Sequence, residues 1–216
     1  MAKAEVTITE PKFQIAEFLI EGDAPLVMNA FPSKAKAAMR AAQEGGGKRA
    51  KGKKEPKDFD LCYRESSHQI DEKTYGIPAS AFRSACISAC RVAGFPMTRA
   101  KLSIFIIADG YDKGEGTPLV AITKGKPKMV VHHVRNETGV CDLRPRAMWD
   151  PGWQAKVRIR YDTEQFQLKD VAALLMRVGL QVGILEGRAD SKKSCGMGWG
   201  SFVIVNQKEK KNEKTA

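Results

Sequence analysis

The sequence predicts an α+β fold, in which strands and helices alternate along one chain. Residues 156–161, Lys-Val-Arg-Ile-Arg-Tyr, alternate basic and apolar side chains as a half-buried strand does. Residues 168–182 repeat apolar side chains at helical spacing. The chain has 216 residues, of which 43% are hydrophobic and 28% charged, so it suits a single domain, residues 1–216, with a real core.

The first part of the chain predicts a strand, a helix and an irregular stretch. Residues 12–21 are rich in Phe and Ile and predict the first strand. Residues 33–43 are rich in Ala and Lys and predict a short helix, whose basic side is by default a solvated face and alternatively a phosphate-facing one. Residues 59–75 have a mixed pattern, which predicts irregular or weakly extended structure.

A second helix is predicted from residue 79 to residue 93. Pro78 suits a helix entrance, where its missing N–H costs little. Residues 94–96, Gly-Phe-Pro, end the helix. The apolar stripe of this helix consists of Phe82, Cys86, Ala89 and Ala93.

The remaining pattern is dominated by strands. We expect a strand over 101–108, a turn over 109–118, a hairpin of 119–123 with 128–134, a loop over 136–153 and a last strand over 201–205. In the strand 156–161, Arg158 and Arg160 lie on the face opposite the apolar residues. The order of elements predicts a ferredoxin-like, RRM-like βαββαβ core with an extra hairpin, both helices on one face and the other face free.

A basic insertion, residues 44–58, interrupts this core. The run from Gly45 to Lys57 holds three successive glycines, six cations and one anion. Such a composition predicts a flexible loop, which serves either as a linker or as a segment that orders on a polyanion. Residues 206–216 predict a charged, frayed tail.

The net charge favours a polyanionic partner. The formal charge is +11 and the pI about 9.5. Nucleic acid fits this charge better than a membrane surface, because we find neither an interfacial basic helix nor an apolar run of membrane-spanning length. The N-terminal residues lack an apolar signal core, which predicts a cytoplasmic protein.

The cysteine pattern predicts free thiols, no metal and no cofactor. None of the five cysteines forms a CxxC pair, and a zinc site needs paired ligands at such spacing. An odd number of cysteines is most simply explained by a reducing compartment. The five are Cys62, Cys86, Cys90, Cys141 and Cys195.

The stretch from residue 178 to residue 205 carries the clearest functional pattern. An apolar helix pattern leads into regularly spaced glycines, then a basic loop, then Gly196-Met-Gly-Trp-Gly200 and a strand. Bare glycine N–H groups beside Arg188, Lys192 and Lys193 predict a cradle for phosphate. The alternative is a tight connection in which glycine only lets a helix pack on a sheet.

Three segments resemble the RAMP superfamily, the RRM-like proteins of CRISPR effector complexes. Residues 20–26 resemble the family's first strand and turn, residues 77–85 (Ile-Pro-Ala-Ser-Ala-Phe-Arg-Ser-Ala) its first helix entrance, and residues 196–200 its glycine-rich loop. The chain is most like the repeated guide-RNA backbone subunit, and a phage- or plasmid-borne relative would share this pattern. The resemblance implies RNA binding and assembly into a filament or effector complex.

The leading hypothesis is a protein that binds single-stranded RNA or DNA along its phosphate backbone and associates with itself or with other effector subunits. Base stacking would come from Trp199 or Trp149, for which core packing is the alternative. The predicted nucleic-acid-binding residues are Lys48, Arg49, Lys51, Lys53, Lys54, Arg83, Arg158, Arg160, Arg188, Lys192, Lys193, Gly196, Gly198 and Trp199.

Two other hypotheses compete with simple binding. A metal-independent endoribonuclease of the same superfamily would need a histidine base, for which the sequence offers His68, His132 and His133. Asp23, in the turn after the first strand, is a further candidate for cleavage and is otherwise a turn residue. A viral mimic that binds CRISPR subunits is the remaining hypothesis.

Overall fold

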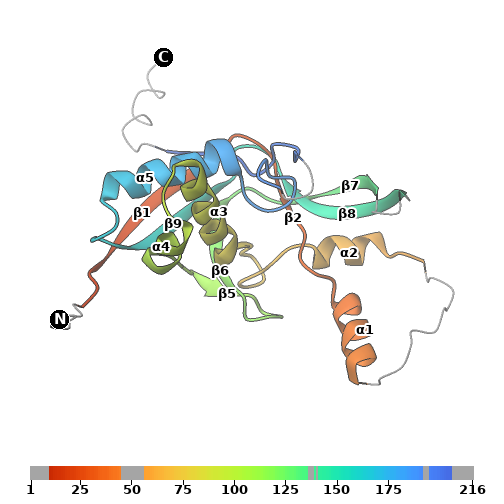
Figure 1. Ribbon diagram of the computed structural model, residues 1–216. Helices are drawn as coiled ribbons and strands as arrows, with labels where there is room; N and C mark the ends of the chain where they lie inside the picture. Colours follow the sequence, from red (N-terminus) through yellow and green to blue (C-terminus); the bar gives the residue numbers. More distant parts are fainter. Residues whose placement is uncertain (1–9, 45–55, 136–138, 140, 192–194, 206–216) are drawn as a thin grey trace, which may run out of the picture.

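The computed structural model describes residues 10–44, 56–135, 139, 141–191 and 195–205. Within these residues, helices and antiparallel strands mix, which confirms the α+β class (Figure 1). The strands form a larger sheet and a smaller one. The tail 206–216 and most of the basic insertion lie outside the described residues.

The larger sheet is centred on β1 (Phe13–Gly22) and β9 (Gln154–Asp162). They pair antiparallel along almost their full length. On the far side of β1 lies β10 (Phe202–Ile204), and on the far side of β9 lies β4 (Ile104–Ile107). The strand order is therefore β10-β1-β9-β4, and the strands predicted at 12–21, 156–161 and 201–205 are confirmed.

Two helices cover one face of this sheet. They are α3 (Ala79–Val92) and α5 (Leu168–Arg177), and a π-helical turn, η1 (Val178–Val182), extends α5 (Figure 1). The apolar side chains of β9 are buried against them, together with Phe82 of α3. Both helices predicted from apolar periodicity are confirmed, although Ala93 at the end of the predicted stripe is exposed.

The other face of the sheet keeps its side chains in solvent. Phe13, Ile15 and Glu17 of β1 are exposed, as are Lys156 and Arg160 of β9. Residues 15 and 17 of β1 lie opposite residues 160 and 158 of β9 in the antiparallel register. The predicted separation of the apolar and basic faces of β9 is therefore confirmed.

Further strands extend the molecule from the end of β9. Ile122 of β6 (Pro118–Lys124) lies opposite Ala155, and β6 also pairs with β3 (Gly76–Pro78) and β5 (Gly110–Tyr111). The smaller sheet has the order β2-β8-β7, formed by β2 (Leu26–Met28), β8 (Cys141–Trp149) and β7 (Lys128–Arg135). In Figure 1 this smaller sheet reaches out to the right of the helices.

The predicted hairpin of 119–123 with 128–134 is wrong in its pairing. Both strands exist, but β6 joins the larger sheet and β7 pairs with β8. The loop expected over 136–153 is also wrong, because residues 141–149 form β8. Pro145 lies within β8, opposite Val131 of β7 and outside residues 147–149, which pair with β2.

Two short helices were not predicted. The stretch 59–75 begins with α2 (Phe59–Glu65), where Asp58 caps the helix by accepting a hydrogen bond from the Leu61 N–H at 2.9 Å. The strand expected over 101–108 starts only at residue 104, because α4 (Met97–Ser103) precedes it. The predicted helix at 33–43 is confirmed as α1 (Ser33–Glu44), which projects at the lower right of Figure 1.

Candidate nucleic-acid interface

A groove of about 330 Å³ lies between α3 and the glycine segment, by which we mean residues 183–191 and 195–200. Ser80, Ser84 and Ser88 stand four residues apart on α3, so all three project from the same face of the helix. Leu185 and Arg188 line it from the glycine segment. We call this hollow the serine groove.

The first turn of α3 opens into one end of the serine groove. The residue at the cap position is Pro78, which provides no side-chain hydrogen bond. The N–H groups of the first helical turn have no carbonyl partner within the helix, and Ser80 and Ala81 of this turn line the groove. Unsatisfied N–H groups and the positive end of the helix dipole make this end favourable for an anion.

A second hollow of about 380 Å³ continues past Arg188 and shares Leu185 and Arg188 with the serine groove. Asn29 and Ser191 line its other side. The Arg188 guanidinium donates one hydrogen bond to the carbonyl of Leu185, at 3.1 Å, which fixes the side chain between the two hollows. Leu185 is the one non-glycine residue among those described with a left-handed backbone, at φ 64°.

At most glycines of the segment, neighbouring protein atoms occupy the space that a Cβ would need. A Cβ on Gly200 would come within 2.0 Å of the Ile184 carbonyl oxygen, and one on Gly196 within 2.1 Å of the Arg188 oxygen. The N–H groups of Met197 and Trp199 both donate to the carbonyl of Gly187. The N–H groups of Met197, Trp199 and Gly200 are therefore bonded within the protein, and close backbone packing accounts for the glycines at 196 and 200.

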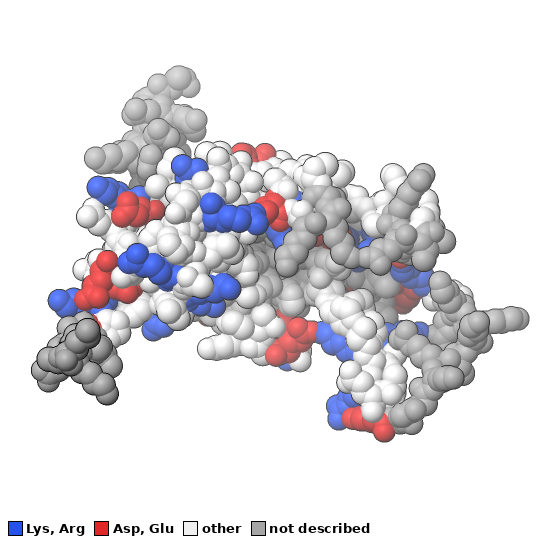
Figure 2. Space-filling view, in the orientation of Figure 1, with Lys and Arg blue, Asp and Glu red and all other residues white. Residues whose placement is uncertain are grey.

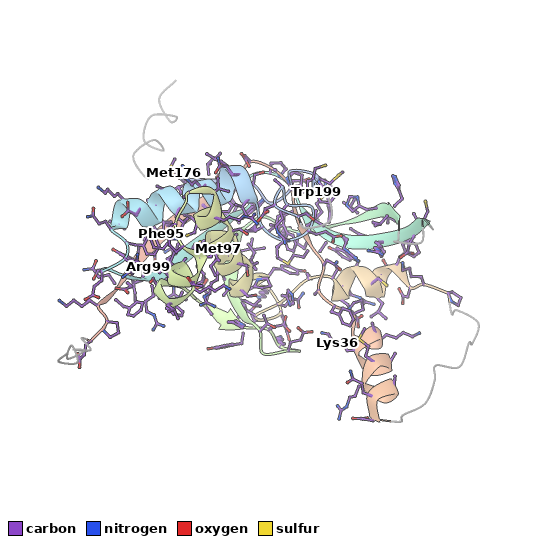
Figure 3. The ribbon with its side chains drawn as sticks, viewed as in Figure 1. Lys36, Phe95, Met97, Arg99, Met176 and Trp199 are labelled. Carbon is purple, nitrogen blue, oxygen red and sulfur yellow. The ribbon has the colours of Figure 1, made fainter. Side chains whose placement is uncertain are left out.

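Gly198 differs from its neighbours because a Cβ there would meet no atom within 4 Å. Trp199 is half-buried, with its ring against Gly187 and 4.9 Å from the ring of His132 (Figure 3). It packs where the glycine segment meets β7. Trp149 and Trp153 are fully buried, which excludes Trp149 as a stacking surface.

Two acidic residues modify the charge around the grooves. A hydrogen bond from Ser88, with help from Arg91, holds the pKa of the Asp190 carboxyl below its usual value. The Glu186 carboxylate accepts a hydrogen bond from Arg146 at 2.9 Å, in a partly buried ion pair. Within the described residues, Arg188 forms no direct ion pair with either acid, although its charge is one of those that lower the pKa of Asp190.

The other predicted cations lie elsewhere. Arg83 leaves α3 on the side of β4, donating to the carbonyls of Ile104 and Lys101, while Arg158 and Arg160 lie on the open face of the sheet. On the face shown in Figure 2, basic and acidic side chains alternate and form no single patch. The predicted residues Lys48, Arg49, Lys51, Lys53, Lys54, Lys192 and Lys193 lie outside the described residues.

The histidines occupy different surroundings. His68 Nδ1 lies 3.0 Å from a carboxylate oxygen of Asp112, with both side chains mostly buried. His132 packs against Trp199, and His133 is exposed on β7. Asp23 is exposed in the turn after β1. The described part of the chain brings no group of three or more His, Cys, Asp or Glu residues close enough to hold a metal ion.

No known protein-family model matches this chain, and a search of curated proteins also finds no match. Among the described helices, none combines the length and apolar character that crossing a bilayer requires. The assignment of the site therefore depends on its own geometry.

Sequence reasoning identified Arg188 as a binding residue and Pro78 as a helix entrance. It did not identify the serines of α3 that line the same groove. The signal was present in the printed sequence, since Ser80, Ser84 and Ser88 recur every four residues in a predicted helix. Serines at such spacing are common on solvated helix faces, so the pattern becomes informative only once the glycine segment lies across it. Asn29 could not be linked to this site from its position in the chain.

Proposed function

We propose that the protein binds single-stranded nucleic acid, with RNA as its principal ligand, along the phosphate backbone in the serine groove. The strand order β10-β1-β9-β4, with two helices on one face, supports a ferredoxin-like, RRM-like core. The resemblance of residues 20–26, 77–85 and 196–200 to RAMP proteins supports RNA and a subunit that works in an effector complex or filament.

The observation that carries this proposal is the convergence of three kinds of hydrogen-bond donor on one hollow. Ser80, Ser84, the first turn of α3 and Arg188 line the serine groove, whereas the Ser88 hydroxyl is hydrogen-bonded to Asp190. Hydroxyls, backbone N–H groups, helix N-termini and arginines are the groups that bind phosphate oxygens in nucleic-acid complexes. A net charge of +11 adds long-range attraction for the strand.

Assembly is part of the same proposal and has its own support. α1 has no buried residue, yet it carries an exposed Met39 and several alanines. A helix of this length is marginally stable in water on its own. Contacts with a neighbouring subunit or with bound nucleic acid would give α1 the packing that it lacks in the isolated chain.

The test is fluorescence anisotropy with single-stranded RNA, single-stranded DNA and duplex RNA across a range of salt. Affinity should fall steeply with salt and favour single strands. Arg188→Gln should weaken binding several-fold and lower the salt slope by about one, as loss of one phosphate contact does. Arg177→Gln, the same change on α5 outside both hollows, should leave both values near those of the wild type.

An affinity that hardly changes between low and moderate salt would contradict backbone binding. Equal losses for Arg188→Gln and Arg177→Gln would contradict the position of the site, because they would reflect net charge alone. Purified protein that carries RNA of defined length would support assembly on a guide, whereas a co-purified protein complex without RNA would support the mimic instead.

The His68–Asp112 pair favours one alternative, the metal-independent endoribonuclease. Asp112 is held in place because its other carboxylate oxygen accepts the N–H groups of Gly114 and Glu115, and it thereby orients the imidazole of His68. An oriented histidine is what a general base for the 2′-hydroxyl requires. Labelled RNA incubated with the protein and a chelator tests this: cleavage that His68→Gln abolishes would establish the enzyme.

A further inference from the structure

A stack of two phenylalanines and two arginines lies at one end of the open sheet face. The Arg160 guanidinium sits 5.4 Å from the ring centre of Phe13 and 5.0 Å from that of Phe105. On Phe105, Arg83 adds a second guanidinium, also at 5.0 Å. The two rings meet edge to face at 5.9 Å. We call these four residues the arginine–phenylalanine stack.

Four elements hold the stack in place. Phe13 begins β1, Arg160 lies in β9 and Phe105 lies in β4, directly opposite Arg160 in the register. Arg83 reaches the same ring from α3 and is fixed by hydrogen bonds to the carbonyls of Ile104 and Lys101. The Arg83 guanidinium is therefore set by backbone contacts and that of Arg160 lies against two rings, which lowers the entropy lost on binding a ligand.

Among the described residues, two other cations of this face are compensated by carboxylates, whereas the arginines of the stack are not. Lys156 pairs with Glu17 at 3.2 Å, and Arg158 pairs with Asp109 at 2.7 Å. Asp162, on the same face as Arg160, accepts the N–H of Glu164 in its own turn. Within the described part of the chain, no carboxylate lies within ion-pair distance of Arg160 or Arg83, so the stack carries two uncompensated cations.

The stack is also accessible. Phe13 is 37% exposed, and Ile15, which lies opposite Arg160, is 63% exposed. Arg160 is exposed as well. Flat guanidinium and aromatic groups beside uncompensated positive charge are the surface on which unpaired nucleobases stack, while the attached phosphates are attracted by the cations.

We propose that the arginine–phenylalanine stack is a base-stacking platform, which takes an unstacked nucleobase of a bound single strand. This inference rests on the proposed function and extends it, because the serine groove contacts phosphates whereas the stack contacts bases. The two sites lie on different sides of α3, where Arg83 faces the stack and its neighbour Ser84 faces the groove. Phosphate contacts and base contacts are therefore separable by mutation.

The test uses two ligands of equal length, a mixed-sequence single-stranded RNA and an abasic ribose-phosphate strand. Phe105→Leu and Phe13→Leu keep an apolar side chain but remove the ring. Each should weaken binding of the RNA about 5-fold or more, since stacking contributes about 1–3 kcal/mol per base. Binding of the abasic strand and the salt slope should stay at wild-type values. Phe31→Leu, at an exposed phenylalanine outside the stack, is the matched control.

The outcomes separate this proposal from the one on which it rests. If the wild type binds RNA with steep salt dependence but both ring variants bind it equally well, the stack is not a base platform and the serine groove proposal stands. If the wild type binds neither strand, both proposals fail. Equal weakening of RNA and abasic strand would also overturn the stacking proposal, because it would show damage to the fold or to phosphate binding. Phe13→Leu remains informative if Phe105→Leu does not fold.

Discussion

The glycine segment and α1 are held by the tertiary structure in opposite ways. The glycine segment has an irregular backbone, yet hydrogen bonds to Val27 and Pro25 and within the segment itself fix it, and its glycines admit neighbouring backbone at close range. α1 is a regular helix with no buried residue, tied down by polar contacts of Ser33 with Glu65 and of Lys36 with Glu115. Regular secondary structure and tight packing are therefore separate properties, and mutations in the two regions should differ accordingly.

The largest effect is expected within the glycine segment, where two glycines have nearly the same φ but different surroundings. Gly200 and Gly198 both have φ just above 70°. Gly200→Ala would force a Cβ to within 2.0 Å of the Ile184 oxygen, so we expect a loss of about 3 kcal/mol or more in the free energy of unfolding. Gly198→Ala meets open space and should cost only about 1–2 kcal/mol of backbone strain.

Urea denaturation of the two variants measures both values. Equal losses in the free energy of unfolding would show that these positions need glycine for its left-handed backbone and not for close packing.

The next effect compares one ion pair in each region. The Arg146 side chain is 11% exposed and that of Glu186 is 27% exposed, whereas Arg40 and Glu44 in α1 are 79% and 63% exposed. Glu186→Gln weakens a charged hydrogen bond in partly buried surroundings and should cost about 1–2 kcal/mol. Glu44→Gln should cost less than about 0.5 kcal/mol, because solvent screens the helical pair.

Thermal unfolding at low and high salt distinguishes the two pairs. The loss for Glu186→Gln should persist in high salt, and a loss that disappears there would place the pair among ordinary surface contacts.

A smaller effect concerns pH. The pKa of Asp190 is lowered in the folded protein, first by the hydrogen bond from Ser88 and then by Arg91. A carboxyl with a lowered folded pKa stabilises the protein above its unfolded pKa, and this stabilisation is lost as the pH falls through the folded value. Asp190→Asn should therefore be less stable than the wild type at pH 7, by less than about 1 kcal/mol because Arg91 is largely exposed.

The gap between wild type and Asp190→Asn should close as the pH drops below about 4, the range in which an aspartate is protonated in the unfolded chain. Unfolding free energies measured at several pH values give this curve. A gap that stays constant down to the lowest pH would mean that the carboxylate charge contributes nothing.

The smallest effect is expected in α1. Met39→Ala removes an exposed side chain and improves helix propensity slightly, so stability should change by less than about 0.5 kcal/mol. The same substitution at the buried Met28 of β2 should cost about 2–5 kcal/mol. If Met39→Ala also cost several kcal/mol in the isolated protein, α1 would be packed in solution, for instance against a second copy.

Local pattern was enough for those elements whose periodicity is strong. The alternation of 156–161, the apolar stripe around Phe82 and the long apolar repeat of 168–182 all correspond to β9, α3 and α5 with η1. Short elements escaped prediction because their signals are weak or ambiguous. The segment of β8 was expected to be a loop, and the cap at Asp58 was overlooked in a mixed stretch.

The candidate site was predictable only in part. Arg188 and the helix entrance at Pro78 were identified from charge and proline position, and both contribute to the serine groove. The serines on the facing helix wall and Asn29 were not identified, because their meaning depends on segments that are far apart in the chain. Arg83, Arg158 and Arg160 were predicted as one group, but they differ in what surrounds them.

By itself, the sequence determined the fold class, the main helices and strands, the basic character and the side of β9 on which the arginines lie. These properties follow from composition and from side-chain periods of 2.0 and 3.6 residues, which are local. Only the tertiary structure decided which strands pair, which backbone fills the space at each glycine and which cations lack a carboxylate. Those depend on contacts between residues distant in the chain, and local periodicity carries no information about distant partners.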